Sequence, residues 1–514
     1  MKLIPIISAL ILAAGSVATA QAPAMTHAVS SEENSPKYIR SYLEILDKGD
    51  VLGTSSWGVV AVRADGDTIV SFNGKRKLVP ASNVKLLTTG LALNELGPDF
   101  RFRTTLAYSG KIEGGALKGD LYIVGGGDPT LGSKDSIAIA TETLFSSWKS
   151  MLAKAGINRI DGRIIGDGRF FDGPIEKDSW SYQDIGTYYG AGGDALCFYR
   201  NVLDIRVSAG TAVGEPVNVV PEYPELPWME YSNVARTSAK GTGDKLFLFN
   251  TDLAPVAQMR GTFAIDRKPK KEECSNKFGA MTMAMYFCNY LKWRGLPVSG
   301  GYADIDYAGN FRSFISKAGD AAVASDSLSV IGHAESPSLK RIAYMTNWRS
   351  DNFYAETMLR MISRTRKGSA DYAVCKLAET EAFRRLGLDA SAVQLTDGSG
   401  LSRDNFVSPE FFCSFLRKMM DTKVFGDYVE TLAQPGYRYY EPRLKGEPET
   451  LRSRIRYRSG SMDGVRCFSG YVIPSEGSKE DTIVFSVMIN NCTAPSWKVL
   501  PLMDKIIALI AACN

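Results

Sequence analysis

The sequence predicts a mixed α/β (α+β) fold with a large β-rich region between two helix-containing parts. Near the start, strand-like runs at residues 57–63 and 68–73 precede a leucine-rich helical pattern. From Phe100 onward, short strands with frequent glycines replace this pattern. Helical periodicity returns near Ala280, and the chain closes with a strand pair and a helix. The two helix-containing parts therefore flank the β-rich part.

The changes of texture divide the chain into four consecutive parts. They are a signal peptide (1–20), a first part with strands and a helix (21–99), a β-rich part (100–278) and a second helix-containing part (279–514). The other elements expected from periodicity are helices at 38–46, 137–155 and 281–293, strands at 102–108, 117–124, 162–167, 465–473 and 482–489, and a C-terminal helix. The glycine run at 125–127 lacks the Gly-Lys-Ser/Thr ending of a phosphate loop, so it predicts a tight turn.

Composition excludes several classes of function. With 514 residues and 45% hydrophobic content, the chain can bury a large core. Its 60 basic and 56 acidic residues form no basic stripe, so we expect no nucleic-acid partner. The two histidines are His27 and His333, and none of the eight cysteines forms a Cys-x-x-Cys pair. We therefore expect no metal, no cofactor and no histidine-dependent hydrolase.

The first twenty residues have the pattern of a secretory signal. Lys2 precedes an apolar run at 3–13, and small residues end at Ala20. The run is too short to span a membrane, and no later run has spanning length. We expect cleavage near Ala20 and a periplasmic mature chain without a transmembrane anchor.

Ser82 and Lys85 are the first candidates for chemistry. They lie where the strand-like runs end and a helical pattern begins, which continues to Gly97-Pro98. A serine hydroxyl is a weak nucleophile until a base takes its proton, and a neutral lysine one helical turn away can be that base. Burial and the helix dipole would lower the pKa of the lysine in the required direction. Ser-x-x-Lys is a weak motif alone, because residues 146–149 match it too.

Two further motifs strengthen the assignment by their order. Ser350-Asp351-Asn352 and Arg458-Ser459-Gly460 follow the Ser-x-x-Lys element, and the last comes just before the C-terminal strand pair. This ordered set is the one found in penicillin-binding proteins and serine β-lactamases.

Over nearly its whole length, the chain resembles the class C low-molecular-mass penicillin-binding proteins, the D-alanyl-D-alanine carboxypeptidase/endopeptidase family. The interval of 268 residues between Ser82 and Ser350 is part of the resemblance. In that family the interval holds domains inserted into the penicillin-binding, serine β-lactamase-like transpeptidase fold. The resemblance therefore implies that residues 21–99 and 279–514 form one penicillin-binding domain, and that residues 100–278 are the inserted β-rich domains. The resemblance implies a penicillin-sensitive serine DD-peptidase that cleaves peptidoglycan stem peptides and is acylated by β-lactams.

The resemblance also implies roles for the motif residues. Ser82 would attack the carbonyl between two D-amino acids, and Lys85 would be its base. Ser350 and Asn352 would relay the proton and orient the substrate. The backbone N–H groups of Ser82 and Met462 would form the oxyanion hole.

The resemblance also implies a pocket for the side chain of diaminopimelate, which maps by motif position onto four residues, Asp184, Tyr189, Arg403 and Asp463. A carboxylate at Asp184 suits a cationic side-chain amine. Exposed aromatic residues around it, in the 180–191 stretch, are typical of a ligand cleft or of a loop that packs on its own rings.

Arg458 departs from the family pattern, which has lysine there. With Ser459 and Gly460, it would bind the terminal carboxylate of the substrate through two hydrogen bonds. Arginine does not deprotonate in proteins, so it cannot join a proton relay. The alternative hypothesis is therefore a catalytically weakened peptidoglycan-binding scaffold. A serine β-lactamase is a second enzymatic alternative, for which the sequence offers no clear deacylating group.

Overall fold

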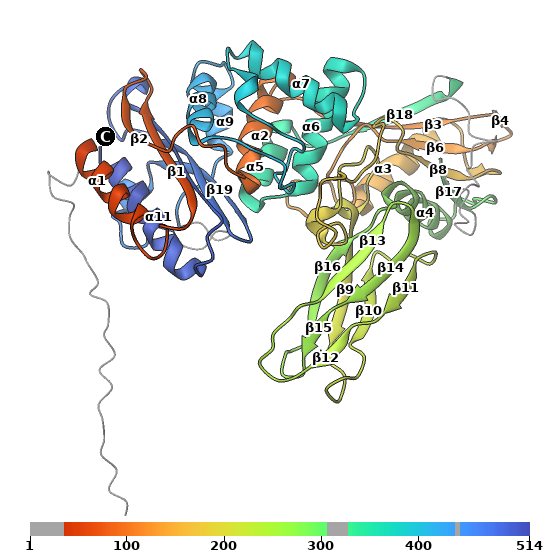
Figure 1. Ribbon diagram of the computed structural model, residues 1–514. Helices are drawn as coiled ribbons and strands as arrows, with labels where there is room; N and C mark the ends of the chain where they lie inside the picture. Colours follow the sequence, from red (N-terminus) through yellow and green to blue (C-terminus); the bar gives the residue numbers. More distant parts are fainter. Residues whose placement is uncertain (1–34, 306–326, 437–442, 514) are drawn as a thin grey trace, which may run out of the picture.

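The computed structural model describes residues 35–305, 327–436 and 443–513. The predicted signal peptide lies outside these residues. Figure 1 shows an elongated molecule with a sheet at each end, a helical layer between them and a projecting β-rich arm. None of the helices in the described ranges is long and apolar enough to span a membrane.

One sheet combines both ends of the chain. Its five antiparallel strands run in the order β19-β20-β21-β1-β2. Their bounds are Ser56–Arg63 (β1), Thr68–Phe72 (β2), Ile455–Met462 (β19), Val465–Val472 (β20) and Ile483–Asn490 (β21). The Arg458 motif, expected just before a strand pair, lies within a third strand, β19, at the sheet edge.

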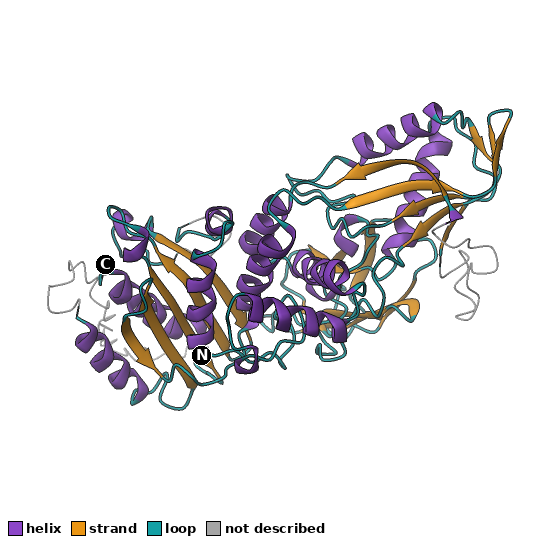
Figure 2. Cartoon of the chain, turned by 90° about the horizontal axis from the view of Figure 1, so that it is seen from above, coloured by secondary structure: helices purple, strands orange, loops and turns teal. Residues whose placement is uncertain are grey.

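Both faces of this sheet are covered by helices (Figure 2). Successive side chains of a strand point to opposite faces, so β1 contributes to two cores. Trp57, Val59 and Ala61 belong to the core under α1 (Pro36–Asp47) and α11 (Ser496–Ala511). Val60 belongs to the core shared with the central helices. The sheet is thus the middle layer of three.

The central helical layer surrounds α2 (Val84–Leu96), which is buried along most of its length. A helix that is apolar nearly all round is stable only when it is enclosed. The Tyr428 hydroxyl also donates to the Leu86 carbonyl at 3.0 Å. The other helices of the layer are α5 (Leu339–Arg349), α6 (Asn352–Lys367), α7 (Tyr372–Arg385), α8 (Pro409–Met420) and α9 (Phe425–Glu430), and a short α10 (Glu449–Arg452) precedes β19.

A second five-stranded sheet lies at the other end, in the order β17-β8-β6-β3-β18. Its helices are α3 (Thr141–Lys154) and α4 (Gly279–Trp293). The strands are β3 (Arg103–Tyr108), β6 (Leu121–Val124), β8 (Ile164–Asp167), β17 (Tyr302–Asp304) and β18 (Ser329–Glu335), with a small sheet of β4 (Lys111–Glu113), β5 (Ala116–Lys118) and β7 (Arg159–Ile160) beside them.

The arm projects from this region and has its own apolar core, which includes Leu203, Ile205, Leu248 and Phe263. Its strands form three small sheets. They are β9 (Val202–Ser208), β10 (Asn218–Tyr223) and β16 (Lys270–Ser275), then β11 (Glu230–Asn233), β13 (Phe247–Thr251) and β14 (Ala254–Arg260), and last β12 (Arg236–Ser238) and β15 (Thr262–Ala264).

The chain enters and leaves the insertion at one point. The Phe102 N–H donates to Ser336 Oγ at 2.9 Å, and the Ser336 N–H donates to the Phe102 carbonyl at 2.9 Å. β17 and β18, which follow residue 278, pair with β8 and β3. We therefore propose that the inserted region extends to about residue 336.

The 180–191 stretch is fixed to the arm by backbone contacts. The Ser275 N–H donates to the Gly186 carbonyl at 2.9 Å, and Ser275 Oγ donates to the Ile185 carbonyl at 3.0 Å. A Cβ at Gly186 would lie 1.7 Å from the Leu248 carbonyl oxygen. Only glycine permits this approach, so the arm sets the position of the stretch.

Substituting Gly186→Ala should therefore destabilise the protein by about 1–3 kcal/mol, because the added methyl group forces the stretch away from β13. Thermal unfolding followed by circular dichroism measures the loss. The matched control is Gly426→Ala in α9, where a Cβ meets nothing within 4 Å; an equal loss in both variants would contradict the packing argument.

Candidate active site

Ser82 lies in a short 3-10 turn, Ala81–Asn83, directly before α2. Ala81 has φ +47°, a conformation that is unfavourable for a residue with a Cβ and that occurs at functional turns. Two glycines let other segments approach the turn. A Cβ at Gly460 would lie 2.5 Å from the Pro80 carbonyl oxygen, and one at Gly400 would lie 1.9 Å from that of Ala81. The turn is therefore held between β19 and the 397–403 loop.

Lys85 is fully buried beside Ser82, with its Nζ 3.1 Å from Ser82 Oγ. Nζ also donates to Asn352 Oδ1 at 2.6 Å and to the Ser399 carbonyl at 2.7 Å. A neutral amine has two N–H groups and one lone pair. Because the two carbonyl oxygens take both N–H groups, the lone pair of a neutral Lys85 faces the Ser82 hydroxyl.

The surroundings lower the pKa of Lys85 to about 7. Burial is the largest cause, and the positive charge of Arg458 is the next. Nearby carboxyl groups, including Glu356 and Asp397, act in the opposite direction. A substantial fraction of Lys85 is thus neutral near pH 7, as a general base requires.

Ser350 and Asn352 meet this pair from the junction of α5 and α6. Ser350 has φ +57° and ends α5, and its Oγ lies 3.2 Å from Ser82 Oγ. Asp351 caps α6, accepting the Tyr354 N–H at 3.0 Å and pairing with Arg200 at 2.5 Å. The cap therefore fixes Asn352, the first residue of α6, beside Lys85.

Arg458 points into the site from β19 and is 1% exposed. Its guanidinium donates to Ser350 Oγ and, at 2.5 Å, to the Ser459 carbonyl. Guanidinium groups only donate, so Ser350 Oγ must be the acceptor in this contact. The hydroxyl proton of Ser350 is then free to point toward Ser82, in the direction of the hydrogen bond between them.

Strand geometry favours Ser461 over Met462 as the second oxyanion donor. The Tyr457 N–H donates to the Ala433 carbonyl at 2.9 Å, on the side of β19 away from β20. Amides of an antiparallel strand alternate between its two sides, and the pairing of β19 with β20 has no register shift. The Ser461 N–H therefore faces the open edge beside the Ser82 turn, whereas that of Met462 faces β20.

An open cavity of about 420 Å³ leads to Ser82. It brings together all four residues expected to bind a cationic side chain. They are Asp184, Tyr189, Arg403 and Asp463, and Ser350, Asn352, Ser461 and Met462 line the same cavity.

Within the cavity, the Tyr189 hydroxyl donates to Asp184 Oδ1 at 3.1 Å, and Arg403 donates to the Asp463 carbonyl at 3.3 Å. Burial raises the pKa of Asp184, and the charge of Arg403 opposes this rise. Asn352 Nδ2 donates to the Tyr189 carbonyl at 2.9 Å. Tyr189 therefore bonds both to Asp184 in the cavity and to Asn352, the residue that accepts from Lys85.

Sequence patterns did not single out Glu356. Its carboxylate is fully buried and accepts the N–H groups of Gly398 and Ser399 at 3.1 and 2.7 Å. These bonds orient the loop whose Ser399 carbonyl accepts from Lys85. The signal was present, since Glu356 follows Asn352 by four residues and thus lies on the same face of one helix.

The second Ser-x-x-Lys match does not form a comparable site. Ser146 is exposed on α3, and Lys149 Nζ donates to the Arg294 carbonyl at 2.8 Å. His333 lies on β18, where its ring nitrogen bonds to the Thr105 hydroxyl at 3.0 Å. None of Ser146, Lys149 and His333 lines the cavity at Ser82.

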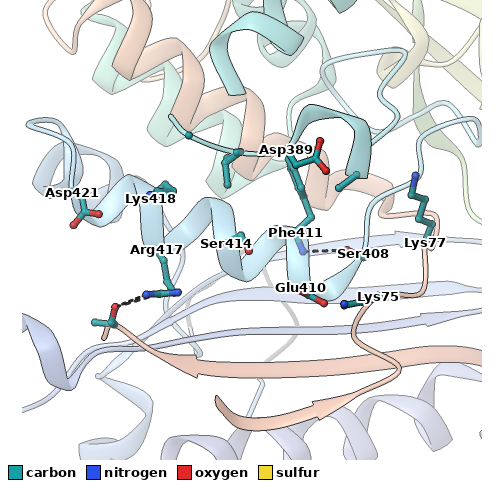
Figure 3. Close-up of a pocket in the computed structure, with 14 residues that line it drawn as sticks. Lys75, Lys77, Asp389, Ser408, Glu410, Phe411, Ser414, Arg417, Lys418 and Asp421 are labelled. Atoms are coloured by element: carbon teal, nitrogen blue, oxygen red, sulfur yellow. Dashed lines mark hydrogen bonds between the residues drawn. The ribbon is translucent and has the colours of Figure 1, made fainter. Parts of the chain in front are cut away.

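A separate hollow of about 510 Å³ lies between α8 and the 387–392 segment (Figure 3). Two of its polar groups bond to other parts of the protein: Ser408 Oγ accepts the Phe411 N–H at 3.1 Å, and Lys77 Nζ donates to the Ser391 carbonyl at 3.3 Å. Among the described residues that line it, no lysine is recorded bonded to a serine hydroxyl. The Ser82 cavity therefore remains the candidate active site.

Fold and site together define a class, the serine peptidases with a penicillin-binding fold. The profile of the D-Ala-D-Ala carboxypeptidase 3 (S13) family matches residues 41–506, and the chain belongs to this family. It is a serine DD-peptidase of peptidoglycan, as the sequence predicts. The alternative of a catalytically weakened scaffold finds no support in the family assignment.

Relatives extend over most of the chain. It is 28% identical to a D-alanyl-D-alanine carboxypeptidase of Actinomadura sp. (strain R39), over 88% of this chain and 80% of the relative. It is 25% identical to a penicillin-sensitive carboxypeptidase A of Dictyostelium discoideum, over 89% and 87%. The fold is similar to that of penicillin-binding protein 4 (dacB) from Haemophilus influenzae, with a TM-score of 0.74, 20% identity and coverage of 92% and 97%. The predicted penicillin-binding fold is thus confirmed.

The pKa of Lys85 leads to a pH prediction. Below about pH 7 the neutral fraction of Lys85 falls tenfold for each pH unit, so the rate constant for acylation of Ser82 by a β-lactam should fall equally steeply. Above about pH 8 the rate should be constant until the fold is affected. Stopped-flow measurements with a chromogenic β-lactam between pH 5 and 9 test this; a flat profile would exclude Lys85 as the base.

Proposed function

We propose that this chain hydrolyses the bond between two D-amino acids in peptidoglycan stem peptides through an acyl-enzyme on Ser82. One observation carries the proposal: both N–H groups of a neutral Lys85 are engaged by carbonyl oxygens, which directs its lone pair at Ser82 Oγ. A nucleophile paired with an oriented base is the signature of covalent catalysis.

In the proposed reaction, Lys85 takes the proton of Ser82 while Ser82 Oγ forms a bond to the scissile carbonyl carbon. The backbone N–H groups of Ser82 and Ser461 stabilise the resulting oxyanion. The C–N bond then breaks, and the leaving amine receives a proton through Ser350. Water hydrolyses the ester with Lys85 again as base, which returns Ser82 to its starting state.

The substrate is proposed from the cavity. Its carboxylate at Asp184 suits the ammonium group of a diaminopimelate side chain, and Arg403 suits the carboxylate of that residue. A β-lactam is attacked in the same way and leaves a stable ester, as a penicillin-sensitive relative suggests. An export signal cleaved near Ala20 would deliver the enzyme to the periplasm, where this substrate lies.

Arg458 has a different proposed role from the direct grip on a carboxylate that the resemblance implies. It is buried and already bonded to Ser350 and Ser459. We assign to it the orientation of Ser350 and the lowering of the pKa of Lys85, in which its charge is the second cause. Both tasks need a permanent cation and no proton transfer.

The nucleophile can be identified directly. After incubation with penicillin, mass spectrometry should find one adduct, on the peptide that contains Ser82, and Ser82→Ala should carry none. The same variant should release no D-alanine from a pentapeptide. Ser146→Ala, at the second motif match, is the control and should behave as the parent; an adduct elsewhere or an unlabelled folded parent would refute the proposal.

The role of Arg458 is tested by removing its charge. Arg458→Gln should move the midpoint of the acylation pH profile upward, because the pKa of Lys85 rises when a neighbouring cation is lost. Arg458→Lys keeps the cation and should leave the midpoint close to the parent value. Thermal unfolding checks that both variants fold, and equal midpoints in all three proteins would contradict the assigned role.

A further inference from the structure

An exposed pair of stacked aromatic rings lies where the arm meets the 180–191 stretch. The rings of Tyr182 and Phe249 are 4.2 Å apart and nearly parallel, at 22°. Tyr182 is 51% exposed and Phe249, on β13, is partly exposed. Two large rings held in a fixed geometry in contact with solvent are typical of a ligand surface.

Arg260 on β14 completes this surface. Its guanidinium lies over the Phe249 ring, 4.9 Å from the centroid, and donates to the Tyr182 hydroxyl at 2.6 Å. Gln258 accepts from Arg260 Nε at 2.6 Å and itself donates to Ser232 Oγ at 3.1 Å. The polar groups are therefore held beside the rings, and the three residues Tyr182, Phe249 and Arg260 are called the aromatic platform below.

The platform is continuous with the active-site cavity. Ser181 and Gln183, the immediate neighbours of Tyr182, line the cavity that contains Ser82. Tyr188, which is 45% exposed, lines it as well. A ligand that leaves the cavity past Ser181 and Gln183 therefore reaches Tyr182 at the rim.

We propose that the aromatic platform binds sugar rings of the peptidoglycan glycan strand while the attached stem peptide occupies the Ser82 cavity. The proposal rests on the proposed function and names a second part of its substrate. It assigns to the arm a direct role in choosing peptides that are still linked to glycan.

The occupant follows from the chemistry of the surface and from the reach of the substrate. The C–H face of a pyranose ring is apolar and packs on aromatic rings, while its hydroxyl and acetamido oxygens accept hydrogen bonds from a group such as Arg260. The four stem residues before the scissile bond extend at most about 14 Å, so the attached sugar must lie near the mouth of the cavity. Tyr182 of the platform lies between Ser181 and Gln183, which both line the cavity.

The decisive experiment compares two substrates with the same stem. The release of D-alanine is measured as kcat/KM for a free pentapeptide and for the same pentapeptide on its disaccharide. The parent should favour the disaccharide form by about tenfold, which corresponds to about 1.4 kcal/mol of additional binding. Tyr182→Ala and Arg260→Ala should lower this ratio toward one and leave the free pentapeptide unaffected.

Matched controls distinguish a failure of the aromatic platform from a failure of the proposed peptidase function. Trp293→Ala removes an exposed aromatic residue of α4, 72% exposed, and should leave the ratio unchanged. Penicillin carries no glycan, so the rate at which it acylates Ser82 should be equal in the parent and in all variants. Equal rates would show that the cavity is intact in each protein. If an active parent has the same kcat/KM on both substrates, the platform does not bind the glycan. The same conclusion follows if Tyr182→Ala lowers kcat/KM equally on both substrates. Either result overturns the role of the platform and leaves the proposed peptidase function in place.

A binding measurement keeps the test independent of catalysis. Peptide-free glycan strands should co-sediment with the parent and with Trp293→Ala but much less with Tyr182→Ala. If no protein releases D-alanine or reacts with penicillin, the proposed function fails, and co-sedimentation still decides whether the platform binds sugar. Equal co-sedimentation of the parent and Tyr182→Ala would contradict the proposal.

Discussion

The structure depends on one constraint, that the amine of Lys85 must be buried and yet fully hydrogen-bonded. Burial makes the neutral form accessible near pH 7, and a buried amine without partners would be strongly destabilising. Asn352 and Ser399 supply the two acceptors from segments that are distant in sequence. Ser82 Oγ is the third hydrogen-bonding neighbour of the Lys85 amine, and it faces the lone pair of the neutral form. The contacts that stabilise the buried amine are therefore the same contacts that activate the nucleophile.

This constraint explains why such different elements meet at one point. The enclosed helix α2 carries Lys85, the cap of α6 carries Asn352, and buried Glu356 orients the Ser399 loop. β19 closes the site from the sheet edge and brings a second cation close to Lys85. The region that we propose as the insertion adds more than two hundred residues between these segments without separating them, because Phe102 and Ser336 are hydrogen-bonded to each other.

Much of this arrangement was predictable, because motifs and periodicity are local signals. The Ser-x-x-Lys turn before a leucine-rich helix, the first hairpin and the last two strands could all be inferred from short stretches. The preference for Ser461 over Met462 could not, since the direction of an amide depends on strand register. The proposed assignment of β17 and β18 to the insertion also needed the structure, because their partner strands lie more than a hundred residues earlier in the chain. The influence of Arg458 on Lys85 needed the three-dimensional contact itself.

The proposed role of the arm depends on how the 180–191 stretch is held. The middle of the stretch, at Ile185 and Gly186, is bonded to β16 and held against β13. Three residues later, the Tyr189 carbonyl accepts from Asn352, which in turn bonds to Lys85. Rigid contacts of this kind transmit position over several residues, because close-packed groups leave little room for displacement. The insertion is therefore more than an appendage on a catalytic domain. It forms one wall of the site, and a ligand held against the arm would be held in register with the nucleophile.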